Sequence, residues 1–383
     1  MDTLFDYLQW MGDFPLAATG VREADALVLG LLSYFDLAPL FKNEDDTHTL
    51  RECLEMVEAD QVRVMVNAKG QDYVGFLRLA AETERFGSLK MSRYIDVLLN
   101  DPPVQFAAVC FQDDTDLKFL VYRGTDQSLA GWEEDFMISF TRTRAQTQAQ
   151  AYANAYVENG RRNYLIGHSK GGNEALFAAA NLRDSKWDAV EHVYILDGPG
   201  LCPEVLDMSG MARVNEKATQ IVPEFSIVGK LFAAELDDTR IVQSSASGFQ
   251  QHSLITWGID HGKLAAAQEN DPTSVWLNGA VDEWIGGVEQ ADRATLVSDL
   301  FEALAAGGAE SLDDLSAGGL GGLEPVLKRM KSSSDTTRRL LGELPKYAVK
   351  RTIVTLRSKF TPDGENEEKP EADEGAPAEP VKV

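Results

Sequence analysis

The chain has 383 residues, of which 44% are hydrophobic and 25% are charged, a composition that excludes a largely disordered or fibrous protein. Acidic residues outnumber basic ones by 61 to 36, and the resulting net charge of -25 argues against general nucleic-acid binding. Its three cysteines, Cys53, Cys110 and Cys202, are widely spaced and predict neither a disulfide framework nor a zinc site.

The first ten residues carry acidic side chains where a signal peptide needs basic ones. No stretch of about 18 apolar residues, the length that crosses a bilayer, occurs in the sequence. We therefore expect a soluble cytoplasmic protein.

The amino-terminal region, 1–100, has apolar residues at helical spacing and predicts a helical and mixed layer packed on a core. The core is expected over 101–265, beginning with two strands at 106–111 and 118–122 that form a hairpin. A helix at 146–159, a strand at 163–166, a helix at 170–181 and a strand at 192–196 follow. This alternation predicts an α/β fold with a mostly parallel central sheet.

The pattern becomes helical again over 266–357, which predicts a carboxy-terminal helical appendage. The last segment, 358–383, is acidic, rich in proline and poor in apolar residues, so we expect it to be disordered. The segment 328–359 holds ten basic residues and two acidic ones. It is expected to contact the protein's own acidic body or tail, an anionic membrane surface or a partner.

The most informative motif is Gly167-His-Ser169-Lys-Gly171, which follows an apolar strand and precedes an alanine-rich helix. This context is typical of a nucleophile elbow, the tight strand-to-helix turn that carries the serine of α/β-hydrolases. Gly167 and Gly171, two residues on either side of Ser169, avoid collisions in such a turn and let the serine project toward substrate. The backbone N–H of Lys170, at the helix start, would point at a developing oxyanion.

A second segment points to the same chemistry. The strand 119–122 leads into Arg123-Gly124-Thr125, with Trp132 and Asp135 downstream. Together with the Gly-His-Ser-x-Gly-Gly elbow, this segment resembles the class 3 (fungal-type) lipases, in which the corresponding loop supplies the other oxyanion donor. The resemblance implies that Thr125 has this role.

More closely, the chain resembles a bacterial lipase-like family of α/β-hydrolases that is related to those enzymes. The resemblance implies an α/β-hydrolase fold with helical additions at both ends, and hydrolase ancestry, without a substrate. It covers most of the chain and is carried by five motifs: Asp6-Tyr7-Leu8 with Gly12-Asp13, Glu23-Ala24-Asp25-Ala26-Leu27, the elbow through Asn173, Asp197-Gly198-Pro199-Gly200, and Ser226-Ile227-Val228-Gly229.

In α/β-hydrolases the triad follows the order nucleophile, acid, base, so the base should be a histidine after the elbow. His192 begins a strand at the end of the sheet away from the chemistry and is a poor candidate. His252 follows a strand at 240–243 and a serine-rich turn, as expected of a late-loop base, and is preferred to His261. His168, beside the nucleophile, is expected to be structural.

The acid is less clear, because Ser226 stands where class 3 lipases have the aspartate of Asp-x-Val-Pro. Asp197 ends the apolar strand that follows the elbow helix, so its carboxylate would emerge at the carboxyl edge beside the serine. Some lipases place the acid there. Glu224 is the reserve acid.

These residues predict a serine hydrolase that cleaves carboxylic esters, lipid esters among them by resemblance, and that needs no cofactor or metal. Its partner would be a small acyl ester. The competing hypothesis is a non-catalytic binding or scaffold protein on a degenerate hydrolase fold, which the departure at Ser226 and the appended helical region favour.

Overall fold

The structure is a computed structural model, and it describes residues 1–66, 70–100, 103–125, 142–201, 208–226, 228–230 and 236–272. Nine further single positions between 274 and 339 are described: 274, 275, 279, 289, 292, 334, 335, 338 and 339. Most of the appendage expected over 266–357, and the whole tail expected over 358–383, lie outside the described residues.

An eight-stranded sheet forms the centre of the molecule, with its strands in the same order in space as along the chain. Pairing is antiparallel from β1 to β4 and parallel from β4 to β8, so four of the seven neighbouring pairs are parallel. The strands are β1 (Thr47–Thr49), β2 (Lys90–Asn100), β3 (Pro103–Gln112), β4 (Leu117–Arg123), β5 (Arg162–His168), β6 (Val190–Leu196), β7 (Ala218–Pro223) and β8 (Thr239–Val242). The α/β fold class predicted from the sequence is confirmed, and the architecture is consistent with an α/β-hydrolase.

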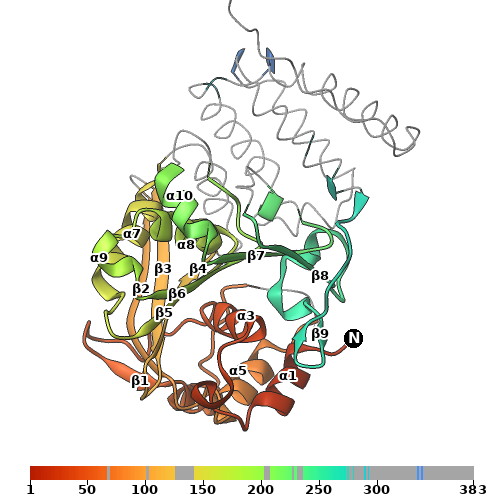
Figure 1. Ribbon diagram of the computed structural model, residues 1–383. Helices are drawn as coiled ribbons and strands as arrows, with labels where there is room; N and C mark the ends of the chain where they lie inside the picture. Colours follow the sequence, from red (N-terminus) through yellow and green to blue (C-terminus); the bar gives the residue numbers. More distant parts are fainter. Residues whose placement is uncertain are drawn as a thin grey trace, which may run out of the picture.

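Helices cover both faces of the sheet (Figure 1). One face packs against α7 (Arg144–Tyr156), α8 (Lys170–Ala180) and α10 (Met208–Asn215). The other packs against α1 (Leu4–Met11), α3 (Glu23–Leu32) and α5 (Tyr73–Glu82). Shorter elements join them: α2 (Leu16–Thr19), η1 (Leu50–Glu52), α4 (Cys53–Glu58), α9 (Asp184–Trp187), η2 (Val228–Lys230), η3 (Gly248–His252), η4 (Leu254–Thr256), and the hairpin of β9 (Ile259–Asp260) and β10 (Lys263–Leu264).

The sheet therefore separates two hydrophobic cores. In β4, Leu120 and Tyr122 belong to the core under α7 and α8, whereas Phe119 and Val121 belong to the core under α1, α3 and α5. This alternation follows from the two-residue period of a strand. Because both faces are covered, β4 is buried along its whole length, which explains its continuous apolar run.

The amino-terminal layer is held by a buried ion pair. Arg85 donates from Nε and Nη2 to the two carboxylate oxygens of Asp25, both at 2.6 Å, and the side chains of this pair have no solvent exposure. Tyr7 donates its hydroxyl hydrogen to Asp25 at 2.7 Å, and Arg85 also bonds to Thr19 and to two backbone carbonyls. Two of the sequence motifs, around Tyr7 and around Asp25, thus meet in one fully hydrogen-bonded cluster.

Replacing Asp25 by asparagine should lower the free energy of unfolding by about 3–5 kcal/mol, because it leaves the Arg85 guanidinium buried without its counter-charge. Urea denaturation measures the change. Asp114→Asn is the matched control, since Asp114 pairs with Lys90 at the surface and is 78% exposed, where such pairs contribute little. Equal stabilities for the two variants would contradict the role of the buried pair.

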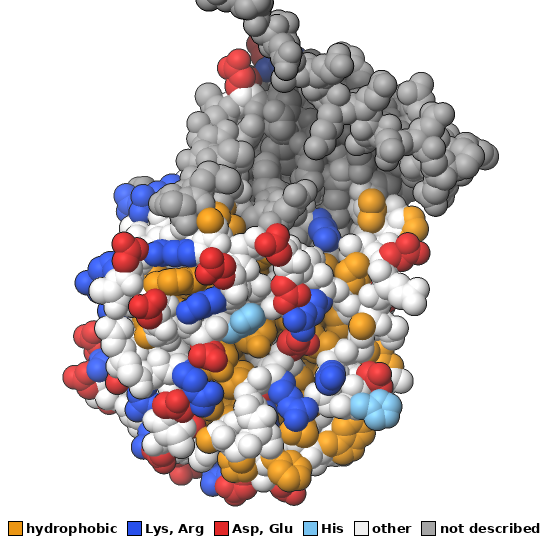
Figure 2. Space-filling view, in the orientation of Figure 1, with side chains coloured by type: hydrophobic (Ala, Val, Ile, Leu, Met, Phe, Trp, Pro, Cys, Tyr) orange, Lys and Arg blue, Asp and Glu red, His pale blue; other side chains and the backbone are white. Residues whose placement is uncertain are grey.

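Acidic and basic side chains are interspersed on the face of the molecule shown in Figure 2, with apolar side chains between them.

Among the described helices, none is long and apolar enough to span a membrane.

Candidate active site

Ser169 lies between the end of β5, at His168, and the first residue of α8, Lys170. Its backbone has φ 58° and ψ -129°, a conformation that non-glycine residues rarely adopt and that is held only where the surroundings enforce it. A Cβ on Gly167 would lie 1.9 Å from the carbonyl oxygen of Gly171, so a side chain there cannot be accommodated. The strand, serine and helix are thus arranged as the sequence predicts for an elbow.

The serine is less accessible than the sequence predicts. Ser169 is only 4% exposed, whereas the tight turn was expected to push it out toward substrate. The loop after β4 packs close to it, since a Cβ built on Gly124 would lie 2.9 Å from the Ser169 Cβ. The turn brings the serine to the carboxyl edge of the sheet, where its side chain is buried.

Asp197 lies beside the elbow because β5 and β6 are parallel neighbours. His168 pairs with Leu196 in the sheet, so the next residue of each strand, Ser169 and Asp197, emerges at the same edge. The N–H of Ser169 donates to the carbonyl of Leu196 at 2.9 Å, which ties the two strand ends together. Asp197 also has a positive φ, 44°, and its side chain is almost fully buried.

The carboxylate of Asp197 accepts hydrogen bonds from three residues. Nδ1 of His252 approaches Oδ2 at 2.6 Å, while the hydroxyl of Ser226 and the N–H of Gly229 donate to Oδ1 at 2.5 and 3.1 Å. Both oxygens are therefore engaged, and the carboxylate is fixed in orientation.

The contact with Asp197 determines the tautomer of His252. A carboxylate can only accept, so Nδ1 carries the hydrogen, and a neutral ring then has its lone pair on Nε2. An imidazole in this state can accept a proton through Nε2, and the carboxylate stabilises the imidazolium that results. His252 ends η3, in the segment after β8 where the sequence predicts a base.

His168 packs against His252 and holds its backbone. The two ring centroids are 4.6 Å apart, and Nε2 of His168 lies 2.9 Å from the carbonyl oxygen of His252, so this nitrogen donates. Nδ1 then accepts from the Tyr34 hydroxyl at 2.6 Å. Burial, followed by the repulsion that a protonated His252 would exert, holds the pKa of His168 well below its usual range, so the ring stays neutral. Its contacts are those of a structural residue, as the sequence predicts.

The two residues expected to stabilise an oxyanion lie close to the serine. Thr125 follows Gly124, whose Cα packs against Ser169, and is 7% exposed. Lys170 starts α8, and its buried side chain donates to the carbonyl of Gln105 in β3 at 2.8 Å. That contact turns the ammonium group of Lys170 toward β3. The group of Lys170 expected to stabilise an oxyanion is its backbone N–H.

The other candidates lie elsewhere. His192 contacts the hydroxyl of Thr219 at 2.9 Å, and burial lowers its pKa. His261 is 95% exposed and contacts its neighbour Asp260. The described contacts of Glu224 are backbone ones, to Val242 and to residues 270–274, and His252 bonds to Asp197 instead. Trp132 and Asp135 fall outside the described residues.

Sequence reasoning missed three residues around the site: Tyr34, Ser226 and Gly229. The second and third belong to the motif Ser226-Ile227-Val228-Gly229, which contributes to the family resemblance and is the place of a missing aspartate, but for which the sequence predicted no role in the site. In the structure this motif bonds to the aspartate of the neighbouring strand. The occurrence of this motif together with Asp197 was the sequence signal that could have identified Ser226 and Gly229. Nothing in the sequence marks Tyr34, which is 134 residues away from its partner His168.

Within the described residues, no group of three or more histidine, cysteine, aspartate or glutamate side chains could hold a metal ion.

A family model described as Mbeg1-like matches residues 80–302, more than half of the chain. The match includes the elbow, Asp197 and His252. A comparison with curated proteins found no match. By the extent of the family match, the chain belongs to the Mbeg1-like family.

Proposed function

We propose that this protein is a serine hydrolase that cleaves carboxylic esters through an acyl-enzyme on Ser169. The observation that carries the proposal is the 2.6 Å contact of His252 with Asp197 next to a serine in strained elbow geometry. Nucleophile, acid and base occur in the chain order of α/β-hydrolases, on the elements where that fold carries them.

In the proposed reaction, Ser169 Oγ attacks the ester carbonyl carbon while Nε2 of His252 takes its proton. Asp197 keeps the ring oriented and stabilises the imidazolium. Negative charge develops on the carbonyl oxygen, where Thr125 and the N–H of Lys170 would stabilise it. Collapse expels the alcohol, which takes the proton from His252, and water then releases the acid from Ser169 by the same steps.

The competing proposal, a scaffold on a degenerate hydrolase fold, loses one of its two supports. Besides the helical appendage, it rested on Ser226 standing in place of an aspartate, but the Ser226 hydroxyl donates to the carboxylate of Asp197. A triad acid on the preceding strand makes an acid at position 226 unnecessary. Resemblance to the class 3 lipases favours lipid esters within the broader class of carboxylic esters.

The proposal is tested with p-nitrophenyl esters of graded chain length, from acetate to laurate. We expect release of p-nitrophenol that saturates with substrate concentration and peaks at one chain length. Well-folded protein that hydrolyses none of the series, and is not labelled by a serine-directed probe, would favour the scaffold.

Ser226→Ala should lower kcat by roughly ten- to a hundredfold, because a hydrogen bond to a charged acceptor contributes about 1.5–3 kcal/mol. The effect is partial, since Gly229 and His252 still bond to Asp197. Steady-state kinetics measure it. Ser247→Ala, in the exposed turn before η3, is the matched control and should behave as wild type. Unchanged kcat in Ser226→Ala would show that this hydroxyl does not support the acid.

A further inference from the structure

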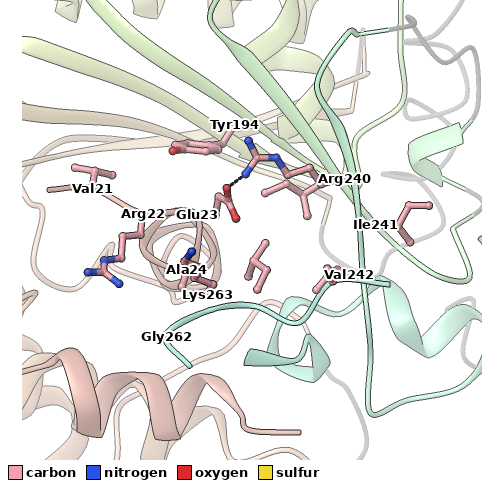
Figure 3. A pocket seen from close by; sticks show the side chains of 13 residues that line it. Val21, Arg22, Glu23, Ala24, Tyr194, Arg240, Ile241, Val242, Gly262 and Lys263 are labelled. Carbon is pink, nitrogen blue, oxygen red and sulfur yellow. Dashed lines mark ion pairs between the residues drawn. The ribbon is translucent and has the colours of Figure 1, made fainter. Parts of the chain in front are cut away.

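A pocket of about 540 Å³ lies on the α3 side of the sheet, between the start of α3, strands β6 to β8 and the β9–β10 hairpin (Figure 3). Its volume is in the range of pockets that bind small molecules, and it is larger than the volume that a bare inorganic anion would occupy. Apolar side chains from each of these elements line it, among them Ala24, Ile221, Val242 and Leu264. An occupant would therefore place an apolar body against these side chains.

The charged residues of the pocket are mostly cations. Arg22, Arg240 and Lys263 line it, with Glu23 as the single carboxylate. Arg240 and Glu23 point toward one another beside Tyr194 and form an ion pair (Figure 3). Such a cluster of cations is unexpected in a chain with 61 acidic and 36 basic residues.

The cations are only partly compensated. Arg240 pairs with Glu23 and also with Asp238, from which it is 2.7 Å away. Arg22 lies against the hairpin turn, its Nη1 3.7 Å from a Cβ built on Gly262. Within the described residues, neither Arg22 nor Lys263 has an ion-pair partner. Arg240 is therefore paired, whereas Arg22 and Lys263 are the two lining cations without an ion-pair partner among the described residues.

We infer that this pocket binds a monoanionic amphiphile, a small molecule with an alkyl or aryl body and one carboxylate. The apolar lining receives the body, and Arg22 with Lys263 receives the carboxylate at the rim. The two cations can both donate to the two oxygens of one carboxylate, while the apolar lining receives a single alkyl or aryl body.

The pocket is separate from the candidate active site. The residues that line it include none of Ser169, Asp197, His252 and Thr125. Helix α3 runs from the pocket, at Glu23, to Leu32, a length of about 14 Å, and Tyr34 just beyond it bonds to His168. The inference concerns binding alone and does not depend on the proposed hydrolase activity.

Isothermal titration calorimetry with sodium octanoate tests the inference, with octanol as the uncharged probe of equal length. Octanoate should bind the full-length protein at one site, and octanol at least tenfold more weakly. The double variant Arg22→Glu and Lys263→Glu should weaken octanoate binding at least tenfold. Arg78→Glu, an exposed arginine on α5 outside the pocket, makes the same kind of charge change and should have no effect.

A neutral variant covers the case in which charge reversal disturbs folding. Ala266→Trp, at an exposed position of the lining, should block the pocket with its charges intact and abolish octanoate binding. Octanoate binding that survives both the double variant and Ala266→Trp would overturn the inference, because the ligand would sit elsewhere. Equal affinity for octanol, or no binding of octanoate to wild type, would overturn it as well.

Discussion

Replacing Ser169 by alanine should reduce ester hydrolysis by about 10⁵-fold or more, since loss of the nucleophile removes the covalent route. The fold should be retained, because the change deletes one oxygen and keeps the Cβ that packs near Gly124. The melting temperature is expected to stay within a few degrees of wild type. Initial rates at saturating p-nitrophenyl ester, with circular dichroism for folding, measure both quantities.

Ser247→Ala serves as the matched control here too, since it removes a hydroxyl from an exposed turn. If Ser169→Ala keeps more than a few per cent of the activity, Ser169 is not the nucleophile, whatever the geometry of its turn.

Asp197→Asn should lower turnover by about 10⁴-fold, the effect known for an acid-to-amide change in serine triads. An asparagine has one acceptor oxygen, whereas Asp197 uses one oxygen for His252 and the other for Ser226 and Gly229. Whichever way the amide is turned, its NH₂ group faces a donor. The histidine then loses either its orientation or its correct tautomer.

Glu224→Gln is the comparison variant and should stay near wild-type activity, because the described contacts of Glu224 are made by its backbone. Values of kcat/KM at pH 7, with circular dichroism of each variant, decide between the two acids. An inactive Glu224→Gln with an active Asp197→Asn would reverse the assignment. Full activity in both would leave a dyad of Ser169 and His252.

The elbow could be predicted because its determinants are local. Glycines at 167 and 171, an apolar strand before them and an alanine-rich helix after them are all read within 20 residues. Asp197 and His252 were also named from the sequence, each from its place after a strand. Their direct contact could not be predicted, since it depends on which strands are neighbours and on how the segment from 243 to 252 returns to the edge of the sheet.

Strand β7 was not predicted, and the reason is its polar content. It is buried at all six positions, yet Thr219 and Gln220 interrupt the apolar run expected of a buried parallel strand. Hydrogen bonds compensate their burial: Gln220 donates to the carbonyl of Gly229 at 2.8 Å, and Thr219 donates to Asp238 at 2.7 Å. These partners lie in other segments, so a local pattern cannot reveal them.

Strand β2 was missed for a different reason. It lies in the antiparallel part of the sheet and exposes several side chains, with Leu98 at 61% and Leu99 at 49%. A bulge between Ser92 and Ile95 also shifts its register. The shift breaks the two-residue alternation by which a half-exposed strand is recognised.

Labelling with a fluorophosphonate probe tests the central claim most directly, because the probe reacts with an activated serine whatever the natural substrate is. Wild-type protein should be labelled at one site, which peptide mass spectrometry should assign to Ser169, and Ser169→Ala should not be labelled. His252→Ala should fold and react far more slowly, because the serine would lose its base. Folded wild-type protein that stays unlabelled, or that is labelled equally after Ser169→Ala, would contradict the assignment of this site as a serine hydrolase centre.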